Sequence, residues 1–375
     1  MAKGITNSAL SLLIIHLRGL ISGCEISAKL DNIDIVNRHR IEAFFPLEYL
    51  ENNSSEEFIN FFRKKRKQKK IRGLRKLNVF KKLTSLLSSN GIDFIVLKGY
   101  PLNKLLFDDE ERRVSRDIDV LVKKENVKKV FDLLIEKGAY LITPDFLIKD
   151  SQWDFFLEEF DQMTFVLPGN RIPIEIHWKL FRNKAYLPIS EEVLFNNKEE
   201  FTIGNIRFNS LKNSLHTLYI SLHGAKHQWD SLVWITDMYM LHEKLSKKEI
   251  TDSLDEAREY GVLDTYVLGF YIANLIFKMD LDPNIQEMFN KDIKRIAHES
   301  FKFLQRTSST AGSSKEVLKR IRYSLKIQRT FKGKMHHFYN FPMYSLKHQS
   351  SRSKFIHWIT RPISQIKEKR SKSKN

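Results

Sequence analysis

The chain has 375 residues, of which 42% are hydrophobic and 12% aromatic, and its formal net charge is +18. This apolar content is enough to bury a core and excludes a disordered chain, and the length predicts two or three domains. A single cysteine, Cys24, excludes a disulfide framework and a cysteine-based zinc cluster, and it suits a reducing compartment, so we expect a cytoplasmic protein.

The positive charge is concentrated in two segments. Residues 301–375 hold 19 Lys or Arg and two Asp or Glu, and 10 of the 14 residues in Arg63–Lys76 are basic. Such segments attract polyanions, namely RNA, DNA or an anionic membrane surface. A solvated, solubilising surface is the other interpretation. The best apolar run, Ala9–Ile15, is too short for a transmembrane helix.

The first part of the chain has the periodicity of helices. Residues 1–60 place apolar residues three and four apart. Asn52–Glu57 has the composition of a turn that caps a helix, and a long helix is predicted from there to Leu87. Gly91 suits the left-handed position after its end. The apolar side of this helix is expected to comprise Leu74, Leu77, Phe80, Leu83 and Leu87.

The middle of the chain has the pattern of a mixed α/β structure. Phe94–Leu97 is a continuous apolar run, typical of a strand buried on both faces, and Val114–Val122 alternates as a second strand. Asn126–Lys137 predicts a helix. Met163–Leu167 and Ile172–His177 predict a hairpin.

These elements predict an α+β fold. We expect four parts: a helical segment with the basic run at 1–90, a core containing the sheet at 91–210, a helical domain at 211–305 and a basic tail at 306–375.

The most informative motif is the Asp-x-Asp sequence at Asp117 and Asp119. Side chains on a strand alternate between faces, so both carboxylates would project to one side, while Ile118, Val120 and Val122 face a core. Adjacent carboxylates repel each other unless a cation lies between them, and such oxygen pairs hold Mg²⁺ or Mn²⁺. Two surface aspartates on a half-exposed strand are the alternative interpretation.

Two further motifs flank this pair. Lys98 and Gly99 stand between a buried strand and a helix, where a glycine turn and a helix N-terminus can receive a phosphate. Downstream, Glu175 and His177 share one face of a strand, so a third carboxylate would complete an acidic triad if the two strands are neighbours.

In combination these motifs resemble the polymerase-β-like nucleotidyltransferase superfamily. More closely, the chain is similar to a bacterial family of uncharacterised nucleotidyltransferases over roughly residues 75–245. The segments that carry the resemblance are Phe94–Gly99, Arg112–Val122, Glu175–Trp178 and His223–Trp229, continuing to Trp234 and Asp237.

The resemblance implies metal-dependent transfer of a nucleoside monophosphate from an NTP to an acceptor, with release of pyrophosphate. It implies that Asp117, Asp119 and Glu175 hold Mg²⁺ or Mn²⁺ and are catalytic. The residues expected to contact the nucleotide are Lys98, Gly99, Arg113, Ser115 and Arg116. The segment Ser115–Asp119 is also close to the pattern of the abortive-infection toxin nucleotidyltransferases.

The helical segment after residue 211 adds a group of polar residues. His223 and His227 lie one helical turn apart, so they could bind zinc, form a structural pair, or line the wall that faces the nucleotide or acceptor. Lys226 and Asp237 belong to the same group, and Asp237 could hold a histidine or Lys226 in place or form a buried salt bridge. Like His177, these residues are candidate acceptor or supporting residues.

The acceptor is left open between RNA, especially tRNA, and a sugar or other small metabolite. The basic segments favour RNA. One departure from the superfamily pattern motivates a second hypothesis: Tyr100 and Pro101 follow Gly99, where the superfamily has a serine. The second hypothesis is a non-catalytic protein of this fold that binds RNA or an anionic membrane surface.

Overall fold

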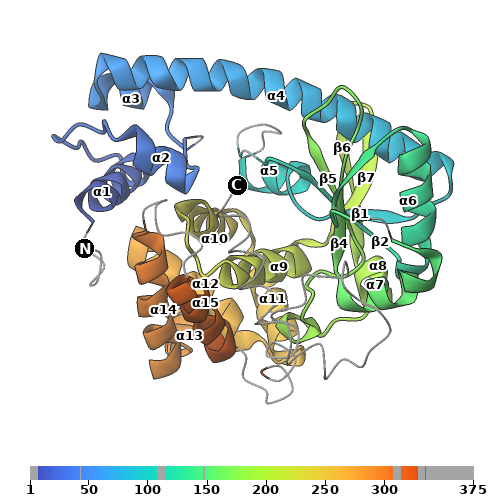
Figure 1. The fold of residues 1–375 in the computed structure, drawn as a ribbon. Helices are drawn as coiled ribbons and strands as arrows, with labels where there is room; N and C mark the ends of the chain where they lie inside the picture. Colours follow the sequence, from blue (N-terminus) through green and yellow to red (C-terminus); the bar gives the residue numbers. More distant parts are fainter. Residues whose placement is uncertain are drawn as a thin grey trace.

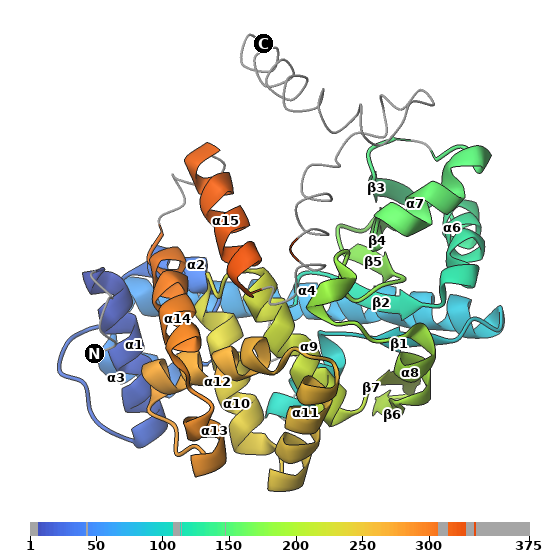
Figure 2. The same cartoon turned by 90° about the horizontal axis from the view of Figure 1, so that it is seen from below.

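The structure is a computed structural model that describes residues 7–42, 44–107, 113, 115–146, 148–306, 314–327 and 334. A mixed sheet occupies one side of the molecule, and helices α9–α15 gather on the other (Figures 1 and 2). The long helix α4, Glu56–Ser89, crosses from the N-terminal helices to the sheet (Figure 1). The α+β class predicted from the sequence is confirmed.

The N-terminal part contains three short helices before α4. They are α1 (Ser8–Ser22), α2 (Ile33–His39) and α3 (Leu47–Asn53). Helix α4 begins after Ser55, whose side chain accepts a hydrogen bond from the backbone N–H of Phe58. Gly91 follows its end with a φ of 65°, as predicted. The placement of Leu74 on the apolar side was wrong, because 58% of this residue is exposed.

The sheet has seven strands in the order β3-β4-β5-β2-β1-β7-β6. Strand β2 runs parallel to β5, and β1 runs parallel to β7, whereas β1 and β2 are antiparallel. The predicted hairpin is formed by β4 and β5. The strands are β1 (Phe94–Val96), β2 (Ile118–Val122), β3 (Tyr140–Thr143), β4 (Gln162–Val166), β5 (Pro173–His177), β6 (Lys198–Ile203) and β7 (Ile206–Leu211).

The structure differs from the predicted strands in two ways. Strand β2 begins at Ile118, so Asp117 stands just before it, and Val114 lies outside the described residues. Strands β3, β6 and β7 were not predicted. Strands β3 and β6 lie at the two edges of the sheet. Strand β6 mixes charged and apolar residues, whereas β3 exposes the apolar side chains of Tyr140 and Ile142.

Helices cover the sheet and build the second half of the molecule. Next to the strands lie α5 (Tyr100–Phe107), α6 (Val127–Glu136), α7 (Trp153–Glu159) and α8 (Glu191–Asn196). Short 3-10 turns occupy Lys124–Asn126, Asp150–Gln152 and Lys184–Tyr186. The predicted helical part at 211–305 is confirmed as α9 (Asn213–Lys226), α10 (Leu232–Lys244), α11 (Lys247–Glu259), α12 (Leu263–Phe277), α13 (Pro283–Glu287) and α14 (Lys291–Leu304). One further helix, α15 (Ser314–Ile327), lies in the segment predicted as a basic tail.

Two hydrophobic clusters hold these parts together. One packs Val120 and its neighbours in the sheet against α4, α6 and α7. The other joins the N-terminal helices to α9–α14 and includes Tyr323 of α15. Helix α9 is buried from Ser214 to Ala225, which is why its sequence lacks a clear polar face.

No helix within the described ranges has the length and apolarity needed to cross a membrane. Of the basic tail predicted at 306–375, the structure describes Arg306, α15 and Lys334, and the rest lies outside the described residues.

Candidate active site

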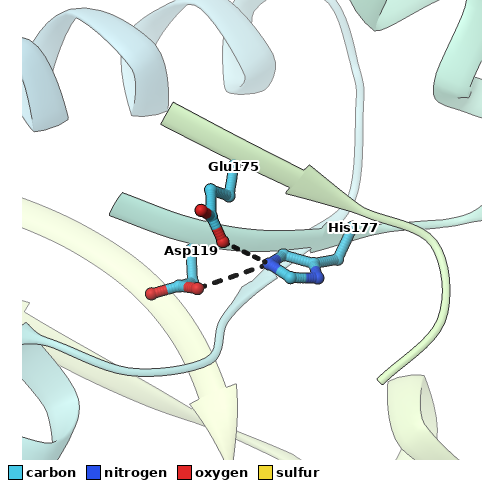
Figure 3. Close-up of side chains that lie close together, drawn as sticks. All are labelled: Asp119, Glu175 and His177. Carbon is cyan, nitrogen blue, oxygen red and sulfur yellow. Dashed lines mark hydrogen bonds and ion pairs between the residues drawn. The ribbon is translucent and has the colours of Figure 1, made fainter. Parts of the chain in front are cut away.

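Three titratable side chains meet where β2 and β5 run side by side (Figure 3). Asp119 of β2 and Glu175 of β5 are Cα partners in the parallel pairing. His177, two residues further along β5, places its Nε2 atom 3.3 Å from Asp119 Oδ1 and 3.5 Å from Glu175 Oε2. One ligand atom of each residue lies within 4.8 Å of the others, so this group can hold a metal ion.

Asp119 is the electrostatic centre of this group. Its side chain is 1% exposed, and its Oδ1 atom lies 3.0 Å from Lys98 Nζ. Burial opposes ionisation of this carboxyl, but Lys98 and His177 together hold the pKa of Asp119 well below its usual range. Its second oxygen, Oδ2, is buried without a hydrogen-bond partner. A buried carboxylate oxygen in this state is suited to a cation.

The neighbours of Asp119 respond to its charge. Burial alone would lower the pKa of His177, but the hydrogen bonds with Asp119 and Glu175 outweigh it, and the pKa is raised above its usual value. Burial also lowers the pKa of Lys98, and the charge of Asp119 reverses this effect, so the amine stays protonated. The negative charge of Asp119 is therefore surrounded by groups that favour a positive charge, Lys98 and His177.

Asp117 stands at the edge of this group. It precedes β2, is partly buried, and its Oδ1 atom accepts a hydrogen bond from the Ser115 hydroxyl at 3.0 Å. Burial and the charge of Asp119 raise the pKa of Asp117. Asp117 lines the same cleft as Asp119 and Glu175, but it does not belong to the group whose ligand atoms all lie within 4.8 Å.

The turn after β1 makes a close contact that only glycine permits. Gly99 has a φ of 78°, and a Cβ atom there would lie 3.1 Å from Lys76 Nζ and 3.5 Å from Ser115 Oγ. Lys76 comes from α4 and is buried, with its amine 4.9 Å from the centre of the Tyr100 ring. Burial lowers the pKa of Lys76 to about 8, although Asp117 and Asp119 oppose this effect. The Lys76 amine and the Ser115 hydroxyl therefore lie next to the turn at Gly99.

These groups open into a cleft of about 320 Å³, which we call the carboxylate cleft. It lies where the sheet meets α9 and α10. Most of the residues selected from the sequence line it: Lys98, Arg113, Ser115, Arg116, Asp117, Asp119, Glu175, His177, His223, Lys226 and His227. Gly99 and Asp237 do not line it, and Asp237 is buried in α10.

Arg113 and Asp237 form a buried, bidentate ion pair. Arg113 Nε and Nη2 donate to the two carboxylate oxygens of Asp237, each at 2.7 Å. The side chain of Asp237 is fully buried, and that of Arg113 is 6% exposed. The backbone of Arg113 also exchanges hydrogen bonds with the Asn103 side chain. This pair connects the segment before β2 to α10. It is the buried salt bridge that the sequence suggested as one role for Asp237.

His223 and His227 form the wall of the cleft opposite the carboxylates. Their ring centroids are 4.6 Å apart, and His227 stacks on Trp234 at 5.5 Å with an interplanar angle of 14°. Burial and nearby Lys226 lower the pKa of His227 to about 3, and burial with Lys98 lowers that of His223, so both rings are neutral. Neither belongs to a group of three metal-ligating side chains among the described residues.

Several cleft residues were missed from the sequence. Arg40, which follows α2, lies with its guanidinium 4.8 Å from the centre of the Trp234 ring. Gln162 of β4 and Tyr219 of α9 also line the cleft, as does Trp234 of α10. Arg40 is 73 residues before Arg113, and no spacing or local pattern signals that it reaches the same cavity.

Comparison with known proteins identifies the family. A search of curated proteins found no match to the chain. The family described as "Uncharacterised nucleotidyltransferase" matches residues 31–278, which include β1–β7 and the whole carboxylate cleft. The match also begins early enough to include Arg40 and α4. The chain therefore belongs to this family of uncharacterised nucleotidyltransferases.

Proposed function

We propose that the protein transfers a nucleoside monophosphate from an NTP to a hydroxyl or phosphate acceptor, in a reaction that depends on Mg²⁺ or Mn²⁺. The observation that carries this proposal is the pairing of Asp119 with Glu175 on adjacent parallel strands, with Asp117 in the same cleft. Membership of a nucleotidyltransferase family supports the class of reaction.

The donor set fits a hard divalent cation. The buried Oδ2 atom of Asp119 has no hydrogen-bond partner, and Glu175 and His177 supply further ligand atoms within 4.8 Å. Oxygen ligands with one imidazole suit Mn²⁺ and, through the carboxylates, Mg²⁺. Asp117, Asp119 and Glu175 would hold the ions, with His177 beside them. A cation held there would supply polarisation of the acceptor oxygen and charge neutralisation at the phosphates.

Glu175 and Lys98 have separate roles in the transfer step. The acceptor oxygen attacks the α-phosphorus, the new O–P bond forms, and the bond to the β-phosphate oxygen breaks, releasing pyrophosphate. Glu175, whose side chain is 23% exposed, takes the acceptor's proton. Lys98 stays protonated and holds Asp119 ionised.

Cations on the rim of the cleft would bind the triphosphate. Arg40, Arg116 and Lys226 line the cavity from three different parts of the chain. Arg113 also lines the cavity, with its guanidinium held and neutralised by Asp237. Gly99 lets the backbone at the start of α5 approach a phosphate closely. Ser115 offers a hydroxyl next to this turn, at the place where the sequence after Gly99 lacks a serine.

The acceptor is RNA, especially tRNA, or a small metabolite such as a sugar. A second candidate function, a non-catalytic protein that binds RNA or an anionic membrane surface, is favoured by Tyr100 and Pro101 standing where the superfamily has a serine. The nearby Ser115 hydroxyl weakens that argument.

Four α-labelled NTPs with Mg²⁺ or Mn²⁺ test the proposal. The wild type and Asp117→Ala/Asp119→Ala would be incubated alone, with total RNA and with a metabolite extract. Label transferred by the wild type and not by the variant is the expected result, and the labelled product identifies the acceptor. Metal-dependent NTP binding without transfer to any acceptor would support the non-catalytic function instead.

A further inference from the structure

A second, larger cavity lies along the basic part of α4. It measures about 1070 Å³ and is lined by α4 between Phe62 and Arg75, by Glu42 and Phe45–Leu47, and by the turn between β4 and β5 at Gly169–Ile172. We call it the α4 groove. Its side chains belong to parts of the chain that are about one hundred residues apart, so the sequence gives no sign of it.

The charged side chains that line the α4 groove are almost all cationic. The one acidic residue, Glu42, lies 3.6 Å from Lys65 and is therefore already neutralised. Within the described part of the chain, three exposed cations of the groove make no ion pair: Lys70, Arg75 and Arg171. The basic residues of the lining are Lys65, Arg66, Lys69, Lys70, Arg72, Arg75 and Arg171.

One of these cations joins the groove to the carboxylate cleft. Arg72 Nη2 donates a hydrogen bond to the backbone carbonyl of Arg116 at 2.9 Å. Arg116 lines the carboxylate cleft, and the next residue is Asp117. The hydrogen bond is to a neutral carbonyl, so the positive charge of Arg72 is not cancelled. An anion lying along the groove would therefore end at the rim of the cleft.

The charge and shape of the groove define its ligand. The cations that make no ion pair, Lys70 and Arg75 on α4 and Arg171 on the turn between β4 and β5, repel one another unless an anion with several charges lies between them. The groove is concave, which suits a flexible chain of phosphates better than a flat membrane surface. Its volume is close to the ~300–1,000 Å³ of small-ligand clefts, so it admits a short length of one strand rather than a duplex. Proteins that bind single strands track the backbone with such grooves.

We propose that the α4 groove binds the sugar–phosphate backbone of a single-stranded polynucleotide and leads its end to the carboxylate cleft. Delivery of an acceptor hydroxyl to Asp117, Asp119 and Glu175 rests on the proposed function, whereas binding in the groove does not. Lys70, Arg75 and Arg171 contact phosphates, and Arg72 sets the path toward Arg116.

The test is fluorescence anisotropy with a 12-nucleotide RNA and a DNA of the same sequence, without NTP or metal, from low to high KCl. The groove variant is Lys70→Gln/Arg75→Gln/Arg171→Gln. The matched control, Lys244→Gln/Lys248→Gln/Lys294→Gln, removes the same charge from exposed positions on α10, α11 and α14. Both variants keep the basic tail, so its contribution is constant.

Each phosphate contact contributes about 0.7 to the salt slope of single-strand binding. The groove variant should therefore lower the slope by about 2 and weaken binding at least about tenfold at 0.1 M KCl, while the control binds like the wild type. Equal binding by the wild type and the groove variant would overturn the inference, as would equal weakening by the control. RNA bound in preference to DNA would identify the strand.

Two further measurements distinguish strand binding from membrane binding and from catalysis. Flotation with vesicles containing anionic lipid that depends on Lys70, Arg75 and Arg171, without oligonucleotide binding, would assign the groove to a membrane surface and overturn the inference. Groove-dependent binding of the oligonucleotide together with no transfer in the labelled-NTP assay would instead count against the proposed function alone.

Discussion

Asp119 and Glu175 face each other across two parallel strands, although 55 residues separate them along the chain. Their pairing depends on the register of β2 and β5, because a slip of one residue would turn every side chain of a strand to the opposite face. The same register places His177 beside both carboxylates. The apolar residues Ile118, Val120 and Val122 fix that register from the other face, where they are buried.

Glu175→Gln should abolish transfer without unfolding the protein. The amide keeps the shape of the side chain but loses the charge and the ability to accept a proton, so kcat should fall at least about 100-fold. Glu200→Gln, on the exposed part of β6, is the matched control. Initial rates with labelled NTP and thermal unfolding would be measured for both. Normal turnover by Glu175→Gln would remove Glu175 from the reaction.

Gly99→Ala should weaken nucleotide binding, because Gly99 has a φ of 78° and its missing Cβ would meet Lys76 Nζ. Gly204→Ala, in the turn between β6 and β7, imposes similar strain at a φ of 55° with no atom within 4 Å. Both should cost about 1 kcal/mol of stability. Only Gly99→Ala should weaken NTP binding, by about tenfold or 1.4 kcal/mol, in titration calorimetry. Equal NTP affinities in the two variants would contradict a phosphate-binding role for this turn.

Asp237→Asn should strongly destabilise the fold, because it leaves the Arg113 guanidinium buried without a counter-charge. Removing one member of a buried pair costs about 3–5 kcal/mol. Urea unfolding would measure the loss. Asp255→Asn breaks the exposed pair with Arg258 and should change stability by less than about 1 kcal/mol.

The paired substitution Arg113→Met/Asp237→Leu sharpens this prediction. It removes both charges, so it should regain much of the stability lost in Asp237→Asn. A double variant as unstable as the single one would show that shape and hydrogen bonding at this position, rather than the unpaired charge, control stability.

Stability should fall on acidification, in part through His39. Burial lowers the pKa of His39 to about 3, and its Nδ1 atom accepts a hydrogen bond from the backbone N–H of Leu232. The unfolded chain takes up a proton near pH 6.5, whereas the folded ring stays neutral down to about pH 3. The free energy of unfolding is therefore highest, as far as His39 is concerned, above pH 6.5. It falls as the pH drops from about 6.5 to about 3, because only the unfolded chain takes up the proton in this range.

Between pH 7.5 and pH 5.5, His39 should account for about 1.4 kcal/mol of the loss. Urea unfolding at both pH values should therefore show a smaller loss for His39→Gln than for the wild type. His298→Gln, at an exposed position on α14, is the control and should behave like the wild type. A loss in His39→Gln as large as that of the wild type would show that His39 is not the titrating group.

Much of the local structure could be predicted because its causes lie close together in the chain. The capping side chain of Ser55 and the left-handed Gly91 define the ends of α4. The alternation in β5 places Glu175 and His177 on one face, as expected. The family resemblance added the class of reaction, and the family match covers the segment that contains the Asp-x-Asp motif.

The contacts that complete the cleft depend on tertiary structure. Three residues reach the site or its surroundings from other helices: Arg40 after α2, Lys76 on α4 and Trp234 on α10. In the sequence, Arg40 looks like part of an ordinary helix end, Lys76 like part of a solvated basic run, and Trp234 like a core residue. Strands β6 and β7 escaped prediction for a related reason, because only their pairing with each other, and the pairing of β7 with β1, shows that they are strands.

By itself, the amino-acid sequence determined the helix ends, the alternation of the central strands and the carboxylates available for chemistry, because these depend on neighbours within a few residues. The tertiary structure alone decided that Asp119 meets Glu175, that Asp237 neutralises Arg113, and that the basic run of α4 faces a groove. Such contacts arise from long-range packing of strands and helices, and sequence spacing carries no information about which distant surfaces come together.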